Sequence, residues 1–85
     1  MTLEIITPDA IVFTGEVTSV TVPGADGMFQ VLNNHAPIIS TLIAGKIKFQ
    51  AADGEQVYDA EGGVVEVLKN KVIVLAERIK LLKEN

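Results

Sequence analysis

The chain is a succession of short runs rich in β-branched residues, each closed by residues typical of turns. The runs cover residues 3–6, 11–13, 16–22, 28–32, 38–43, 46–51, 56–60, 64–68 and 72–75. Short strand-forming runs at even spacing, with Gly, Pro, Asp and Asn between them, are typical of all-β folds. The pattern predicts a β-sandwich or a small barrel of mostly antiparallel strands.

Several local patterns place turns and bends between these strands. Residues 46–51 alternate, with Ile47, Phe49 and Ala51 on one side and lysine or glutamine on the other, as in a half-buried antiparallel strand. Asp53-Gly54 predicts a hairpin turn, and the segment 69–71 predicts a second one. Gly62-Gly63 predicts a bulge or kink where one strand bends between two sheets.

The end of the chain departs from the strand pattern. Residues 76–85 have a weakly amphipathic period that includes Ile79 and Leu82. A segment of this length is too short to form a stable helix alone in water. We expect a β-sandwich domain over residues 1–76, followed by a short tail over 77–85 with weak helical character.

Composition excludes several function classes. With 85 residues the chain is a single small domain, and without cysteine it has no disulfide, thiolate metal site or cysteine nucleophile. The net charge of -4 argues against nucleic-acid binding, which requires clustered cations. Neither a targeting segment nor a membrane span is visible, so we expect a soluble chain that stays where it is made.

Residues that carry chemistry are sparse. The single histidine, His35, has no nucleophile elbow beside it, so we expect it to cap a loop rather than to catalyse. One histidine cannot form a zinc site, and the acidic stretch over 53–61 lacks the glycine placement of a calcium loop. We therefore predict no catalytic residue, no metal and no cofactor.

One alternative concerns the second hairpin. Lipoyl and biotinyl carrier domains are small β-sandwiches that present one lysine on a tight hairpin. The hairpin Lys69-Asn70-Lys71 lies between two valine-rich strands, so either lysine is a candidate for such a modification. The Met or Asp that usually precedes the carrier lysine is absent.

Three segments together resemble a known family. Residues 23–37, PGADGMFQVLNNHAP, resemble the glycine turn, strand and His-Ala-Pro loop of the epsilon subunit of F-type ATP synthases. Upstream, residues 6–9 and 12–17 are similar to that family's opening strands. Downstream, residues 60–67 and 71–77 resemble its Gly-Gly strand and final hairpin, so the resemblance extends along nearly the whole chain.

The resemblance implies a flattened β-sandwich at the foot of a central stalk. A subunit of this kind binds the gamma subunit, rests on the polar loops of the c-ring, and contacts the catalytic alpha and beta subunits only indirectly. It turns with the rotor and helps to couple transmembrane ion flow to ATP synthesis, performing no bond chemistry itself. The implied location is peripheral, at the cytoplasmic face of the cell inner membrane.

The partner-binding residues implied by the resemblance are Asp26, Gly27, Met28, Asn34 and His35. Where the family commonly has an acidic residue after the second glycine of the turn, this sequence has Met28, so we expect Asp26 to supply the negative charge. Asn33-Asn34 replaces the usual Pro-Gly before the histidine. Because Asn tolerates left-handed backbone geometry, we expect the turn to persist.

Many members of this family continue into a C-terminal helical hairpin that can inhibit ATP hydrolysis and in some cases binds ATP. This sequence stops ten residues beyond Leu75. The resemblance therefore implies a subunit that couples and holds, without the inhibitory arm and without its nucleotide site.

Overall fold

Seven strands and no helix make up residues 1–84, the part of the chain that this computed structural model describes. The strands are β1 (Thr2–Ile6), β2 (Ile11–Gly24), β3 (Gly27–Leu32), β4 (Ile38–Leu42), β5 (Gly45–Ala51), β6 (Gly54–Leu68) and β7 (Lys71–Glu84). The predicted all-β class is confirmed. Within these residues no helix is long and apolar enough to cross a membrane.

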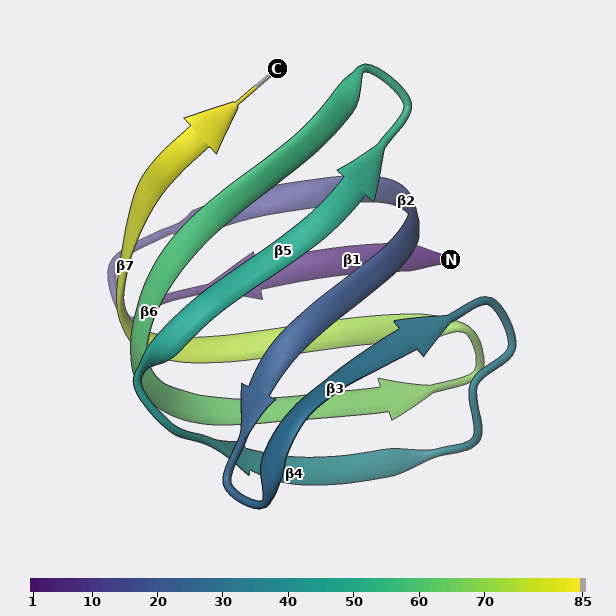
Figure 1. The fold of residues 1–85 in the computed structure, drawn as a ribbon, viewed down its shortest axis with the longest axis horizontal. Coiled ribbons are helices and arrows are strands. Elements are labelled where there is room, and N and C mark those ends of the chain that lie inside the picture. Colours follow the sequence, from purple (N-terminus) through teal and green to yellow (C-terminus); the bar gives the residue numbers. More distant parts are fainter. Residues whose placement is uncertain (85) are drawn as a thin grey trace.

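The strands form two layers that run in different directions (Figure 1). The first sheet contains β4, residues 63–68 of β6, residues 71–76 of β7, β1 and the start of β2. The second sheet contains β3, the rest of β2, β5, and the remaining halves of β6 and β7. Because β2, β6 and β7 take part in both layers, the β-sandwich is joined through bent strands, and its extents are 29 × 27 × 22 Å.

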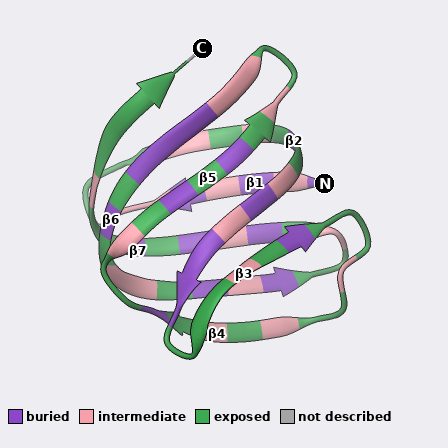
Figure 2. Ribbon diagram, viewed as in Figure 1, coloured by how far each residue is buried: buried purple, intermediate pink, exposed green. Residues whose placement is uncertain are grey.

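The core lies between the two sheets. Buried and exposed positions alternate along the strands, as Figure 2 shows, because successive side chains of a strand point to opposite faces. Fully buried valine, leucine, isoleucine and phenylalanine side chains each contribute about 1.5–3 kcal/mol. Phe49 is central, with ring centroids 4.4 Å from Phe13 and 5.9 Å from Tyr58. The large, fully buried side chains are Leu3, Ile5, Val20, Val22, Val31, Ile47, Phe49, Val65, Val67, Val72 and Val74.

The predicted bend at Gly62-Gly63 is confirmed and joins the two halves of β6. Both residues have positive φ, 65° and 135°. A Cβ atom on Gly63 would lie 1.9 Å from the Leu75 carbonyl oxygen, so only glycine fits where β6 passes β7. The bend moves β6 from the second sheet to the first without ending the strand, which is why the predicted runs 56–60 and 64–68 form one element.

The two predicted hairpins are present, with one adjustment. Leu68 pairs with Lys71, and the two loop residues Lys69 and Asn70 both have positive φ, 50° and 62°, as a tight primed turn requires. At the other hairpin Ala51 pairs with Gly54, so the loop is residues 52–53 and the glycine begins β6.

The weak helical tendency of the C-terminal segment does not produce a helix in the described residues. Strand β7 instead continues across the predicted boundary between residues 76 and 77 as far as Glu84, paired with the first half of β6. That neighbouring strand supplies hydrogen bonds and apolar contacts that a helix of this length would lack alone. The last residue of the predicted tail, Asn85, lies outside the described residues.

Candidate interaction surfaces

The turn between β2 and β3 presents three of the predicted site residues. Gly24 and Gly27 pair across this turn, and a Cβ on Gly24 would lie 2.8 Å from the Phe29 ring, so the approach is close. Gly27 has φ 128° with open space where a Cβ would stand. Asp26 is exposed and Met28 is 57% exposed, whereas the neighbouring Phe29 packs against the core.

The loop that carries His35 forms a turn. The His35 backbone N–H donates to the Leu32 carbonyl oxygen at 3.2 Å, and Asn34 has φ 61°. Asn34 therefore adopts the left-handed geometry that an asparagine tolerates, and the turn persists as expected. The His35 Nδ1 atom lies 2.8 Å from the Ala36 carbonyl oxygen, which can only accept. Nδ1 must consequently be the protonated nitrogen, which leaves Nε2 of the half-buried ring free to accept a hydrogen bond when the ring is neutral.

The structure brings four of the five predicted residues together. Asp26, Gly27, Met28 and His35 line one groove of about 360 Å³, together with parts of β2, β3 and β4. Asn34 is not among its lining residues. The Asn34 backbone N–H donates instead to Asn70 Oδ1 at 2.8 Å, which ties the His35 loop to the hairpin between β6 and β7.

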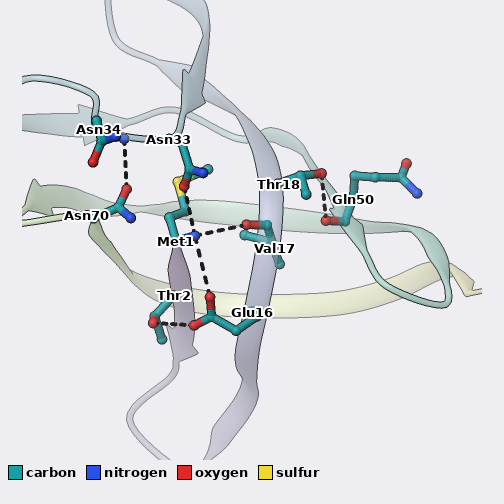
Figure 3. A network of polar contacts seen from close by, with 9 residues as sticks. All are labelled: Met1, Thr2, Glu16, Val17, Thr18, Asn33, Asn34, Gln50 and Asn70. Carbon is teal, nitrogen blue, oxygen red and sulfur yellow. Dashed lines mark hydrogen bonds and ion pairs between the residues drawn. The ribbon is translucent and has the colours of Figure 1, made fainter.

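A polar network beside that loop holds the start of β1 (Figure 3). The amino group of Met1 donates to Asn33 Oδ1 at 2.9 Å and to the Val17 carbonyl oxygen at 3.3 Å. The Thr2 hydroxyl donates to Glu16 Oε2 at 2.6 Å. This hydrogen bond, with the nearby amino group as a smaller contribution, lowers the pKa of Glu16 below its ordinary value.

The outer side of the first sheet is largely apolar, and we call it the apolar face. Across it Ile6 pairs with Leu75 and Leu75 pairs with Val64, which gives one continuous apolar row. Leu75 is 50% exposed and Ile39, on β4, is 73% exposed. The apolar side chains of this face are Ile6, Ile11, Ile39, Val64, Leu68, Ile73 and Leu75.

The outer side of the second sheet is polar, and we call it the charged face. Register places Asp59 between Lys46 and Lys80, and Glu61 opposite Arg78. Lys83 Nζ lies 3.5 Å from Glu55 Oε1. The cations of this face are Lys46, Lys48, Arg78, Lys80 and Lys83.

A subunit of the resembled family is expected to expose an apolar patch, but the residues of the apolar face were not predicted from the sequence. A signal was available, because strands with apolar residues on both sides are typical of sheets covered on both sides. Residues 64–68 and 72–75 carry such apolar residues at most outward positions, whereas 46–51 alternates with lysine. Assigning those outward positions to one surface required the pairing of β1, β6 and β7, which are distant in sequence.

The described residues offer little for bond chemistry. Residues 1–84 contain no group of three or more His, Asp or Glu side chains that could hold a metal ion. The hydrogen bond recorded for the His35 ring goes to a backbone carbonyl oxygen. These residues instead present a β-sandwich with one apolar face, one charged face and a mixed groove at its end.

Comparison with known proteins gives the family. The β-sandwich domain of the ATP synthase delta/epsilon chain matches residues 1–81, and the chain belongs to this family. It is 45% identical over 78 residues to the ATP synthase epsilon chain of Chlorobium limicola, covering 91% of this chain and 89% of that one. The epsilon chain of Chlorobaculum tepidum is 43% identical over 79 residues, covering 92% and 90%.

The fold is also that of a solved structure. A chain in the Euglena gracilis mitochondrial ATP synthase, described as OSCP/F1/c-ring, superposes with a TM-score of 0.86 at 21% identity. The match covers 93% of this chain and 51% of that chain, so this chain spans about half of its solved counterpart. The flattened β-sandwich predicted from the resemblance is confirmed, and the carrier-domain alternative belongs to a different family.

Proposed function

We propose that this chain is a coupling subunit in the rotor of an F-type ATP synthase. In this role it binds the gamma subunit, contacts the polar loops of the c-ring, and helps to couple ion flow through the membrane to ATP synthesis. It reaches the alpha and beta subunits only indirectly and performs no bond chemistry. The relatives named as epsilon chains support this assignment, and membership of the complex would keep the chain peripheral at the cytoplasmic face of the inner membrane.

The apolar face is the observation that carries the proposal. On one sheet, Ile39 is 73% exposed, Ile11 is 63% exposed and Leu75 is 50% exposed. Exposing so many large apolar side chains is unfavourable for a small domain without a partner. Contiguous exposed apolar surface of this kind is typical of a protein–protein interface. We therefore assign the apolar face to gamma.

We assign the groove that contains Asp26, Met28 and His35 to the polar loops of the c-ring. Asp26 supplies an exposed carboxylate, and Met28 adds an exposed apolar side chain next to it. His35 Nε2 adds a second acceptor, and no lysine or arginine lines the groove. A loop that offers hydrogen-bond donors or a basic side chain would complement this arrangement.

The role proposed for residues 1–84 does not include inhibition by a helical arm. The described residues end in β7 and none of them is helical, so they offer no helical segment that could extend along gamma. The role proposed for them is to hold gamma and the c-ring together and to couple ion flow to ATP synthesis.

Binding to gamma is the experiment that tests the proposal. Isothermal titration calorimetry of the purified chain against the gamma subunit of the same organism should give saturable binding with a negative heat-capacity change, because apolar surface is buried. Size-exclusion chromatography should show co-elution. If neither method detects association, the assignment as a rotor subunit is wrong.

Asp26→Lys tests the ring contact separately. Because Asp26 is an exposed turn residue, we expect the substitution to change the unfolding free energy by less than about 0.5 kcal/mol. In the assembled enzyme it should lower proton-driven ATP synthesis while gamma binding stays normal. Asp53→Lys, in the turn between β5 and β6, is the matched control for added charge. Normal assembly and normal synthesis in the Asp26 variant would rule out this contact.

A further inference from the structure

The apolar face contains an open recess of about 450 Å³ where β1 ends beside the bend of β6. Gly63 and Ala76 pair there and line the recess, and Ala76 is itself buried in the core. The apolar row of Ile6, Val64 and Leu75 borders it. At this point residue 63 of β6 must be glycine, because a Cβ there would clash with the Leu75 carbonyl oxygen.

The lining argues against a free small molecule as occupant. Ligand pockets usually combine apolar walls with a few convergent polar groups that fix orientation. Here Thr7 and Glu77 are the only lining residues with polar side chains, and the Thr7 hydroxyl already faces the Ala10 carbonyl oxygen at 3.4 Å. The recess is also continuous with the apolar face, because Ile6, Val64 and Leu75 belong to both.

The charged residues around the recess indicate which kind of partner side chain would lie beside the apolar group that fills it. The Glu77 carboxylate lies over the bend, with Oε1 3.5 Å from where a Cβ on Gly62 would stand. Glu4 and Glu66 flank Ile73 on the same face, where Lys71 is the cation. The face is therefore apolar with an acidic bias, which favours a partner surface that is apolar with a basic side chain beside it.

We propose that the recess bounded by Ile6, Pro8, Val64 and Leu75 receives one bulky apolar side chain of gamma, with a basic side chain of gamma placed against Glu77. This inference rests on the proposed function and adds to it an anchor point within the apolar face. Interfaces commonly concentrate their affinity in a few large side chains that fill such recesses.

Filling the recess with apolar volume tests the anchor. Val64→Phe keeps the face apolar but occupies the space, so the dissociation constant for gamma should rise at least about tenfold. Lys48→Phe adds the same kind of volume on the charged face, away from the recess, and its dissociation constant should stay within about twofold. Leu75→Phe fills the recess from β7 and should behave like Val64→Phe, which guards against a folding defect peculiar to one variant.

The outcomes separate this inference from the proposed function. If the unmodified chain binds gamma and both recess variants bind equally well, the anchor is wrong and the coupling role stands. If the unmodified chain does not bind gamma, the proposed function itself fails. Analytical ultracentrifugation guards against a different occupant: a dimer of the unmodified chain that becomes monomeric in Val64→Phe would mean that a second copy fills the recess, which would also overturn the inference.

The contribution of the Glu77 carboxylate beside the recess can be measured separately through the rate of association with gamma. Glu77→Lys should slow association with gamma several-fold at low ionic strength, and the difference should shrink as salt is added. Asp53→Lys, on the hairpin between β5 and β6, should leave the association rate unchanged. Equal rates for the two variants would overturn the placement of a basic side chain at Glu77.

Discussion

The two outer faces of this β-sandwich are built from the same three long strands and have opposite chemistry. On the apolar face, β6 and β7 pair Val64 with Leu75. On the charged face the same two strands pair Asp59 with Lys80 and Glu61 with Arg78. The change occurs at Gly62-Gly63, where β6 bends from one sheet to the other.

One strand pair can thus supply an apolar surface and a solvated surface at once. Cross-strand pairs of opposite charge and lysine-rich strands are typical of sheets that face water, and they also discourage unwanted edge contacts. The apolar face lacks that protection over its central row. Exposing this row to water costs free energy unless a partner covers it. The contrast between the two faces therefore favours the apolar face as the proposed partner site.

The largest effect is expected from breaking the bend that separates the two faces. Gly63→Ala should lower the unfolding free energy by roughly 3 kcal/mol or more, because the new Cβ would lie 1.9 Å from a carbonyl oxygen at a strained φ of 135°. Urea denaturation measures the loss. Gly27→Ala is the control, since φ is 128° there but nothing lies within 4 Å of the added atom. Equal losses would show that the crossing of β6 and β7 is not the constraint.

The second largest effect is expected when charge is changed on each face and the affinity for gamma is compared. Leu75→Glu should weaken gamma binding by about 2 kcal/mol or more, roughly thirtyfold, because a charge enters the centre of an apolar contact. Lys48→Glu, on the charged face, should change the dissociation constant less than about twofold. Both positions are exposed, so circular dichroism and thermal melting should show folded proteins. A stronger effect from Lys48→Glu would reverse the assignment of the faces.

A pH-dependent effect is expected at the margin of the apolar face. The Thr2 hydrogen bond lowers the pKa of Glu16 in the folded state, so its stabilising contribution is present above the unfolded pKa and is lost as the pH falls through the folded pKa. Thr2→Val removes the donor and should raise the pKa of Glu16 toward its ordinary value. Carboxyl NMR titration measures that shift, and the acid limb of the stability curve should move to higher pH. An unchanged Glu16 titration in Thr2→Val would contradict this account.

The smallest effect is expected for the ion pair of the charged face. Glu55 and Lys83 are 3.5 Å apart, with side chains 42% and 53% exposed. Solvent screening limits such pairs to about 0.2–1 kcal/mol. A double-mutant cycle with Glu55→Gln and Lys83→Met should give a coupling energy in that range that falls with added salt. A larger coupling would mean that the charged face contributes more to stability than an exposed surface should.

Sequence patterns predicted much of the fold because strands and turns have local causes. The alternation over 46–51 and the paired turn residues 69–70 depend on neighbours in the chain, and both appear as expected. The Gly62-Gly63 bend was also predicted, because two glycines in a valine-rich run have few other uses. The strand over 77–84 was missed, since its partner β6 lies some twenty residues earlier and no local pattern reveals that pairing.

The candidate site was likewise predicted from the sequence only in part. Asp26, Gly27, Met28 and His35 were predicted and do line one groove, because turns on two neighbouring segments carry them. Their role in binding remains a prediction. The resemblance placed Asn34 with them, but its backbone N–H donates to Asn70, a residue of a different hairpin. The recess beside Val64 had no sequence signal, because its lining residues come from three segments of the chain that are distant in sequence.

By itself the sequence determined the all-β class, the turns, the bend and the resemblance to the family that the comparisons establish. Each of these follows from short-range backbone preference or from motifs read along the chain. Only the tertiary structure decided that Leu75 faces outward in an apolar row while Lys80, five residues later on the same strand, lies on a charged one. The physical reason is that the surface character of a strand is set by which distant strands pair with it and by where it bends.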